Sequence, residues 1–238
     1  MIFRSSISTS ILRNIVFSLL LLTVTPDVSA QKPRNKTQEK IYANSVDDSI
    51  PFFRGFQVKA DMVGLVQKMV SDYGQYEAGV RVNLRDKYFP VIELGLGKAD
   101  HTDIITQTSY DTSAPYGKIG MDFNIMKNKH DIYRVLIGLR YAYTSFKFNV
   151  EHADLTDPVW GGTTPFVGHD IKANCHWAEL LAGVDAKIWG PLHLGWSVRY
   201  KHRLKYDNGD LGNVWYVPGF GKQGSSRITG TFDISLEF

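Results

Sequence analysis

Residues 227–238 read Arg-Ile-Thr-Gly-Thr-Phe-Asp-Ile-Ser-Leu-Glu-Phe, and this stretch decides the fold. From Ile228 to Phe238 the even positions are apolar or glycine, and the odd positions are polar or charged. A two-residue period gives a β-strand one apolar face and one polar face. A slip of one residue would turn every side chain to the opposite face, so the pattern also fixes the register of the strand.

Seven further segments with the same period predict seven more strands, at 55–68, 75–84, 88–98, 116–126, 132–148, 171–189 and 192–204. Each has at least about the nine to eleven residues that a tilted strand needs to cross a membrane, and some extend further. The connections 85–87, 127–131 and 190–191 are short, whereas 99–115, 149–170 and 205–226 are long. The connection 70–74 departs from this alternation because it is short where a long one is expected. Short turns at one end and long loops at the other are typical of an outer-membrane barrel.

The first thirty residues have the pattern of a secretory signal peptide. Arg4 and Arg13 are basic, an apolar run covers 15–24, and small residues end at Ala30. The run is shorter than the roughly 20 residues of a transmembrane helix, which favours a cleaved signal. We therefore expect a signal peptide at 1–30, a flexible periplasmic leader at 31–53 and an outer-membrane β-barrel at 54–238.

Charge and cysteine usage exclude several classes of function. The formal net charge is +3, which is too balanced to indicate nucleic-acid binding. Cys175 is the single cysteine, so the chain has neither an intramolecular disulfide nor a thiolate metal cluster. We expect no cofactor and no metal.

The two ends of the chain carry a family resemblance. The ending Thr231-Phe232-Asp233-Ile234-Ser235-Leu236-Glu237-Phe238, together with Val28-Ser29-Ala30 before Gln31-Lys32, resembles small eight-stranded bacterial outer-membrane β-barrels. It is particularly similar to a family of such barrels from Bacteroidota described as a domain of unknown function. The resemblance implies an all-β fold, a closed antiparallel eight-stranded transmembrane β-barrel with long outer loops. It also implies contact with membrane lipid and lipopolysaccharide, and an address for the outer-membrane assembly machinery formed by Phe232, Ile234, Leu236 and Phe238.

In a membrane barrel the polar strand faces line the lumen, and eight strands enclose only enough space for side chains to fill. Eight basic and eight acidic residues fall on these faces: Lys59, Asp61, Glu77, Arg81, Glu93, Lys118, Asp122, Arg134, Arg140, Glu179, Asp185, Lys187, Arg199, Lys201, Asp233 and Glu237. Buried charges need partners, so equal numbers predict a closed lumen filled by ion pairs. A narrow channel is the alternative, although a selective pore would be expected to have one sign of charge in excess.

The last strand allows a more specific prediction. It should pair with the first strand to close the barrel, with Asp233 and Glu237 pointing inward. Their expected basic partners are Lys59, Arg199 and Lys201.

Aromatic residues near the strand ends favour a membrane barrel over a soluble one, because such belts lie at the depth of the lipid headgroups. The expected belts are Tyr88, Phe89, Tyr133 and Trp189 at one rim, and Tyr143, Phe146, Phe148, Trp177 and Tyr206 at the other.

A lipid A-modifying enzyme is the enzymatic alternative. Such an enzyme would place a histidine, a serine and an orienting carboxylate at the membrane rim. Ser145, His176 and Glu179 are the weak candidates, and the chain has no His-x-Ser triplet. Two pairs suggest metal ligation without a third ligand: His101 with Asp103, and His169 with Asp170.

Aromatic residues also occur in the long connections, at Trp160, Phe166, Trp215, Tyr216 and Phe220. Exposed aromatics can bind a protein or glycan partner, but they can equally pack together as a cap over the barrel mouth. We favour the cap. The expected function is a non-enzymatic outer-membrane barrel with a structural or partner-contacting role.

Overall fold

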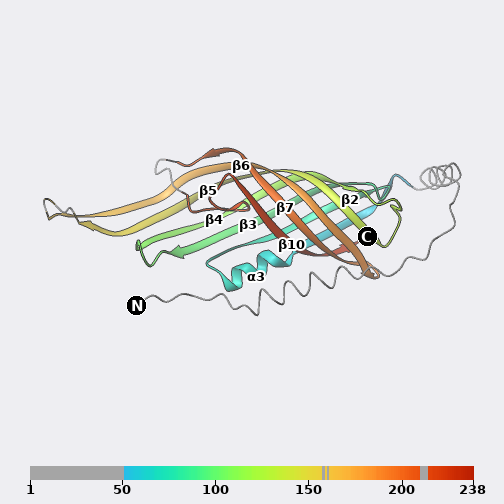
Figure 1. Ribbon diagram of the computed structural model, residues 1–238, viewed down its shortest axis with the longest axis horizontal. Helices are drawn as coiled ribbons and strands as arrows, with labels where there is room; N and C mark the ends of the chain where they lie inside the picture. Colours follow the sequence, from blue (N-terminus) through green and yellow to red (C-terminus); the bar gives the residue numbers. More distant parts are fainter. Residues whose placement is uncertain (1–50, 157–158, 160, 210–213) are drawn as a thin grey trace, which may run out of the picture. The chain divides into compact units, whose positions relative to one another are not determined.

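The computed structural model describes residues 51–156, 159, 161–209 and 214–238. The predicted signal peptide, 1–30, and nearly all of the predicted leader lie outside these residues. Eight strands form a closed antiparallel barrel in the order β1-β10-β7-β6-β5-β4-β3-β2. Figure 1 shows the long strands and, beside them, helix α3. Their bounds are β1 Phe53–Asp61, β2 Tyr73–Leu84, β3 Tyr88–Thr102, β4 Thr108–Asn124, β5 Tyr133–Thr156, β6 Thr163–Trp189, β7 Leu192–Asp207 and β10 Ser226–Glu237. The predicted fold class is confirmed.

The barrel closes where the sequence predicts, between its first and last strands. β1 pairs with β10 from Gln57 opposite Glu237 to Asp61 opposite Asp233. Phe56 and Phe238 extend the seam by exchanging two backbone hydrogen bonds of 2.9 Å. The predicted pairing is thereby confirmed, and the odd residues Thr231, Asp233 and Ser235 of β10 are buried.

Tight connections gather at one end of the barrel, between β2 and β3, β4 and β5, and β6 and β7. This end is called the turn end here, and it also holds Phe238. The opposite end, called the loop end, carries strands longer than predicted. Much of 99–115 and 149–170, expected as loops, belongs to β3, β4, β5 and β6. The alternation of apolar and polar residues fades there because the outer face becomes polar, at Lys98 and Asp111 for example, although pairing continues.

The predicted first strand, 55–68, is wrong in its second half. β1 ends at Asp61, and helix α3 follows at Met62–Val70. Asp61 caps the helix, because its carboxylate accepts hydrogen bonds from the backbone N–H groups of Val63 (3.0 Å) and Gly64 (3.2 Å). This helix also explains the short connection at 70–74, since the whole loop-end connection runs from Met62 to Asp72. Within the described residues, no helix is long and apolar enough to cross a membrane.

Part of the predicted outer loop 205–226 folds back into the barrel mouth. Residues 214–222, called the plug hairpin here, contain the short strands β8 (Tyr216–Val217) and β9 (Gly221–Lys222). Inward side chains of the wall hold it: Tyr110 donates a hydrogen bond to the carbonyl of Tyr216 (2.8 Å) and Lys201 to that of Gly219 (2.6 Å). The hydroxyl of Tyr216 donates to the carbonyl of Gly74 at 3.2 Å.

Gly219→Ala should loosen the plug hairpin. Gly219 has φ +80°, and an added Cβ would lie 2.5 Å from the ring of Tyr116. A positive φ and a clash with a buried ring should together destabilise the docked hairpin by about 1–3 kcal/mol. Limited trypsin digestion should then cut faster after Lys222. Gly224→Ala, in the same connection, is the control, because its Cβ would meet only the Ser226 carbonyl at 3.7 Å; equal cutting of the two variants would contradict the docking.

Candidate functional site: a closed and charged lumen

The barrel has an inverted distribution of polarity. Glu93 is 0% exposed while its neighbour Leu94 is 67% exposed, and Arg140 is 1% exposed while Leu139 is 61% exposed. The two-residue period of each strand produces this contrast, because successive side chains point to opposite faces. The charged faces therefore converge on the lumen and the apolar faces cover the outside.

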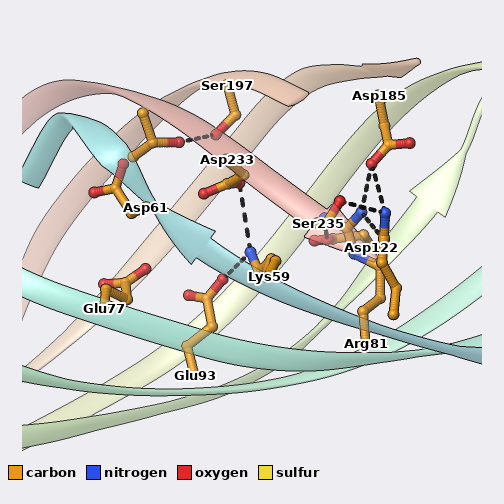
Figure 2. Close-up of polar contacts among 12 residues, drawn as sticks. Lys59, Asp61, Glu77, Arg81, Glu93, Asp122, Asp185, Ser197, Asp233 and Ser235 are labelled. Carbon is orange, nitrogen blue, oxygen red and sulfur yellow. Dashed lines mark hydrogen bonds and ion pairs between the residues drawn. The ribbon is translucent and has the colours of Figure 1, made fainter. Parts of the chain in front are cut away.

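Glu93 of β3 lies at the centre of the charged interior. Lys59 contacts it, the Nη1 of Arg199 lies 3.1 Å from its Oε2, and the Nη2 of Arg140 lies 3.3 Å from its Oε1. Lys59 also lies 3.7 Å from Asp233, and Figure 2 shows it between these two carboxylates. One carboxylate thus joins cations from β1, β5 and β7, which lie on different sides of the barrel.

A second layer lies toward the turn end. Arg81 is 2.9 Å from Asp122 and 3.4 Å from Asp185, as Figure 2 shows, and Arg140 is 3.1 Å from Asp122. Gln57 donates hydrogen bonds to Ser235 (2.7 Å) and Asp185 (3.1 Å). Neutral and charged groups together therefore satisfy the buried carboxylates.

A third layer lies toward the loop end. Lys118 is 2.9 Å from Glu77 and 3.0 Å from Glu179. Two aromatic side chains also donate hydrogen bonds to these carboxylates: the Tyr116 hydroxyl to Glu77 (2.8 Å) and the Trp177 indole N–H to Glu179 (2.7 Å). This layer lies beneath the plug hairpin, because Trp177 also contacts the ring of Phe220.

The turn end holds a polar vestibule of about 310 Å³. There Glu237 is 2.9 Å from both Arg134 and the Nε2 of His193, and it accepts a hydrogen bond from Asn83 at 2.8 Å. Asp86, on the adjacent turn, is 3.5 Å from Arg134. Residues from β2, β5, β7 and β10 thus meet at this rim.

The predicted partners of Glu237 are wrong. Lys59, Arg199 and Lys201 lie deeper in the barrel, where Lys59 and Arg199 approach Asp233 at 3.7 and 3.9 Å. Lys201 pairs with neither acid and lies 3.9 Å from Glu179 instead. The prediction chose partners on β1 and β7, the two strands that neighbour β10. Arg134, which pairs with Glu237, reaches it from β5 instead.

Two of the sixteen predicted lumen residues have other environments. Lys187 is exposed beside the vestibule, because it lies at the rim of the barrel two residues before β6 ends. Asp61 is buried, but its carboxylate caps α3. The prediction missed His193 and Asn83, although their parity with Arg199 and Arg81 on the same strands would have found them. Asp86 lies on a turn, where no period applies.

The predicted aromatic belts are partly wrong. Tyr88, Tyr133, Tyr143 and Trp189 do point outward, but Phe89, Phe146, Phe148 and Trp177 are buried inside, and Tyr206 is half-buried. Parity explains the inward set, since Phe146 and Phe148 share a face with Arg140. Phe146, Phe148 and Trp177 form an aromatic core above the ion pairs with Tyr110, Tyr116, Tyr216 and Phe220. Phe89 belongs to a separate cluster with Leu136 and Leu181.

The aromatic residues of the predicted outer loops lie in different environments. Tyr216 and Phe220 are buried in the plug hairpin, so they are unavailable to a partner. Trp215 is half-buried and stacks on His101 with ring centroids 4.3 Å apart. Phe166 is exposed on β6, and Trp160 lies outside the described residues.

The candidate catalytic residues do not meet. Ser145 and His176 lie on the outer face, where the Nδ1 of His176 is 2.6 Å from the Tyr141 hydroxyl. Glu179 points into the lumen and pairs with Lys118. Because odd and even residues of β6 point to opposite sides, Glu179 cannot orient His176.

The two histidine–aspartate pairs are also separated. His101 bonds Asp72 at 2.7 Å, while Asp103 accepts hydrogen bonds from the backbone N–H groups of Ile105 and Thr106, which hold the pKa of its carboxyl below the usual value. His169 lies 3.9 Å from Glu151, and Asp170 is 3.1 Å from Lys147. In the part of the chain that the structure describes, no group of three or more His, Cys, Asp or Glu side chains could hold a metal ion.

Comparisons with known proteins give a family and several similar structures. The model of the family described as Domain of unknown function (DUF6048) matches residues 11–238. No curated protein matches the sequence. The chain is similar to Neisserial surface protein A, with 13% identity, coverage of 78% of this chain and 99% of that chain, and a TM-score of 0.41. It is similar to a major outer membrane protein from Thermus thermophilus, with 14% identity, 77% and 98% coverage and a TM-score of 0.43. It is also similar to Ail, the attachment invasion locus protein of Yersinia pestis, solved with the heparin analogue sucrose octasulfate, with 8% identity, 77% and 93% coverage and a TM-score of 0.35.

Glu93→Gln should be strongly destabilising. The change removes the charge that compensates three buried cations, and breaking a buried pair from one side costs about 3–5 kcal/mol. Urea unfolding of the barrel refolded in detergent would measure the loss. Asp170→Asn is the matched control, because its pair with Lys147 is exposed and should contribute only about 0.2–1 kcal/mol. Similar unfolding midpoints for the two variants would contradict the central role of Glu93.

Proposed function

The chain belongs to the DUF6048 family, and we propose that it is a non-enzymatic outer-membrane β-barrel with a closed lumen. The observation that carries the proposal is the apolar belt on its outside. Large apolar side chains are exposed around the ring, among them Ile92, Leu94, Ile119, Leu139, Leu180, Trp196, Val198 and Ile228. Soluble monomers rarely expose contiguous apolar patches above a few hundred Å², so a lipid environment accounts for this belt.

The height of the belt supports the same environment. On β5 the outward side chains are apolar or aromatic from Tyr133 to Tyr143 and become polar at Ser145 and Lys147. At about 3.3 Å per residue this stretch is roughly 33 Å long, and a tilt of about 40° reduces it to a height of about 25 Å. The lipid-facing band of transmembrane barrels is about 25 Å tall.

The interior favours a closed barrel over a channel. Three layers of ion pairs cross the lumen, and above them the aromatic core and the plug hairpin occupy the mouth. An ion that entered would have to displace buried pairs, each of which loses its compensation when separated.

The extended ends of β5 and β6 provide the surface for contacts outside the membrane. They continue beyond the belt with polar outward residues, including the exposed pair Lys147–Asp170. The exposed side chains of Phe166 and Val167 lie in the same hairpin. We assign contact with a protein partner, a glycan or lipopolysaccharide to this hairpin, while the barrel itself has a structural role in the envelope.

In fractionated cells the protein should be found in the outer membrane. The purified barrel should conduct no ions. In planar bilayers, the wild-type chain should give no stable conductance steps. Deletion of the plug hairpin alone should also give none, because the ion-pair layers remain below it. Steps that vanish in Glu93→Gln or Arg199→Gln would establish an ion path through the lumen and overturn the closed-barrel proposal.

Deletion of Phe238 should impair assembly. Phe238 makes the last two backbone bonds of the β1–β10 seam and its ring packs on Phe56 at 5.6 Å between centroids. Its loss should lower the amount of heat-modifiable barrel in the outer membrane, measured by electrophoresis of unboiled and boiled membranes. Phe238→Leu keeps an apolar terminal residue and serves as the control; full assembly of the deletion variant would contradict a role for Phe238 in closure or targeting.

A further inference from the structure

The barrel wall is incomplete on one side of its loop half. β1 reaches only to Ala60 opposite Ala78 on β2 and Asp61 opposite Asp233 on β10. Beyond that point β2 pairs with β3 alone, and β10 from Phe232 to Ser226 pairs with β7 alone, among the described residues. The two strands that flank β1 therefore face each other across a gap in the hydrogen-bonded wall.

Helix α3 occupies this gap unevenly. On the β2 side the packing is close, because a Cβ on Gly64 would lie 2.5 Å from the carbonyl oxygen of Gln75. A Cβ on Gly74 would likewise lie 2.5 Å from the Cβ of Lys68. On the β10 side the helix and the strand are separated by a cavity of about 60 Å³, which has room for about two water molecules or one small anionic group. The helix thus packs tightly on β2 and leaves a cavity between itself and β10.

The cavity is lined by hydrogen-bond donors without partners. The Nε of Arg227 and the Oγ1 of Thr229, both inward on β10, are buried and have no hydrogen-bond partner in the described part of the chain. Gln67 of α3 and Gln75 of β2 add amide groups from the opposite wall. Buried polar groups are rarely left unpaired, so this arrangement indicates a ligand that accepts hydrogen bonds.

The charge of the residues around the cavity also favours an anionic ligand. Arg227 lies directly opposite Lys201 on β7, and like charges in that position repel. Lys201 is buried, and Glu179 approaches it only to 3.9 Å. The remaining carboxylate of the lining, Asp61, accepts hydrogen bonds from the first turn of α3. Two cations and one engaged carboxylate leave the cavity positive, which favours an anion.

The outer side of the gap is apolar. Ile228 of β10 and Tyr76 of β2 are exposed on its two edges, and α3 exposes Val66 and Met69. An amphiphile that enters from this side would keep its apolar tail against the apolar belt and place its charged headgroup beside the cations. From this geometry we propose that the gap beside α3 is a lateral binding site for an amphiphile with a phosphate headgroup, with Arg227 and Thr229 as its ligand-binding residues.

Native mass spectrometry of the refolded, heat-modifiable barrel tests this site, which rests on the proposed membrane location. Titration with lysophosphatidic acid should give a saturable one-to-one complex, whereas lysophosphatidylcholine, with its zwitterionic head, should bind weakly. Arg227→Gln should weaken binding of lysophosphatidic acid about tenfold or more, because it removes a charge-assisted hydrogen bond. Thr229→Val, which keeps the shape of the side chain, should weaken it by a smaller factor.

The controls separate a ligand site from a structural one. Arg85→Gln at the turn end should leave binding unchanged. Thermal unfolding of Arg227→Gln should occur at the wild-type temperature or above, because the change removes repulsion from Lys201 and breaks no ion pair among the described residues. Wild-type binding by Arg227→Gln, or equal binding of the two lipids, would overturn the site. Displacement by inorganic phosphate at the same affinity as lysophosphatidic acid would show a free-anion site and overturn the lateral entry.

This result is distinguishable from a failure of the proposed location. A chain that binds lysophosphatidic acid but fractionates away from the outer membrane would contradict the location alone. A chain found in the outer membrane that binds neither lipid would contradict the lateral site alone.

Discussion

The cost of removing charges from water constrains the whole interior of this barrel. A lumen bounded by eight strands is filled by its own side chains, so every ionised group there must find its partner inside the protein. Glu93 shows how this is met, since it receives cations from β1, β5 and β7. One strand separates β3 from β1 and from β5, and three strands separate it from β7, so none of these pairs joins adjacent strands. The ion pairs therefore fix the cross-section of the barrel as well as compensating the charges.

The same constraint explains why parity predicts this fold so well. Exchanging inner and outer faces would place Arg140 on the apolar outside and Leu139 among carboxylates, so each strand has one tolerable orientation. Strand existence, pairing order and the inward direction of nearly all predicted lumen residues could be derived from the two-residue period. The individual ion pairs could not, because they depend on the stagger of the strands: Arg134 reaches Glu237 from β5, and His193 reaches it from the neighbouring β7.

The features that the sequence did not predict lie where the period stops. Helix α3 begins at Met62, directly after its N-cap Asp61. Asp61 also continues the two-residue period of β1, so the sequence pattern did not indicate its capping role. The plug hairpin has no periodic pattern, and its position depends on hydroxyl and ammonium donors from Tyr110 and Lys201. The buried aromatic residues were predicted to form belts because they lie near strand ends. Residues typical of a membrane rim are equally suited to an aromatic core when they fall on the inner face.

The seam between β1 and β10 combines strong and weak elements of this design. Its turn half has a continuous backbone ladder, and Lys59 ties it to the interior through Glu93 and Asp233. Its loop half lacks that ladder, and a nine-residue helix fills the space instead. Helix side chains can shift without breaking interstrand hydrogen bonds, whereas a paired strand cannot. The loop half of the seam is therefore held by the side-chain packing of α3, whereas interstrand hydrogen bonds hold the turn half.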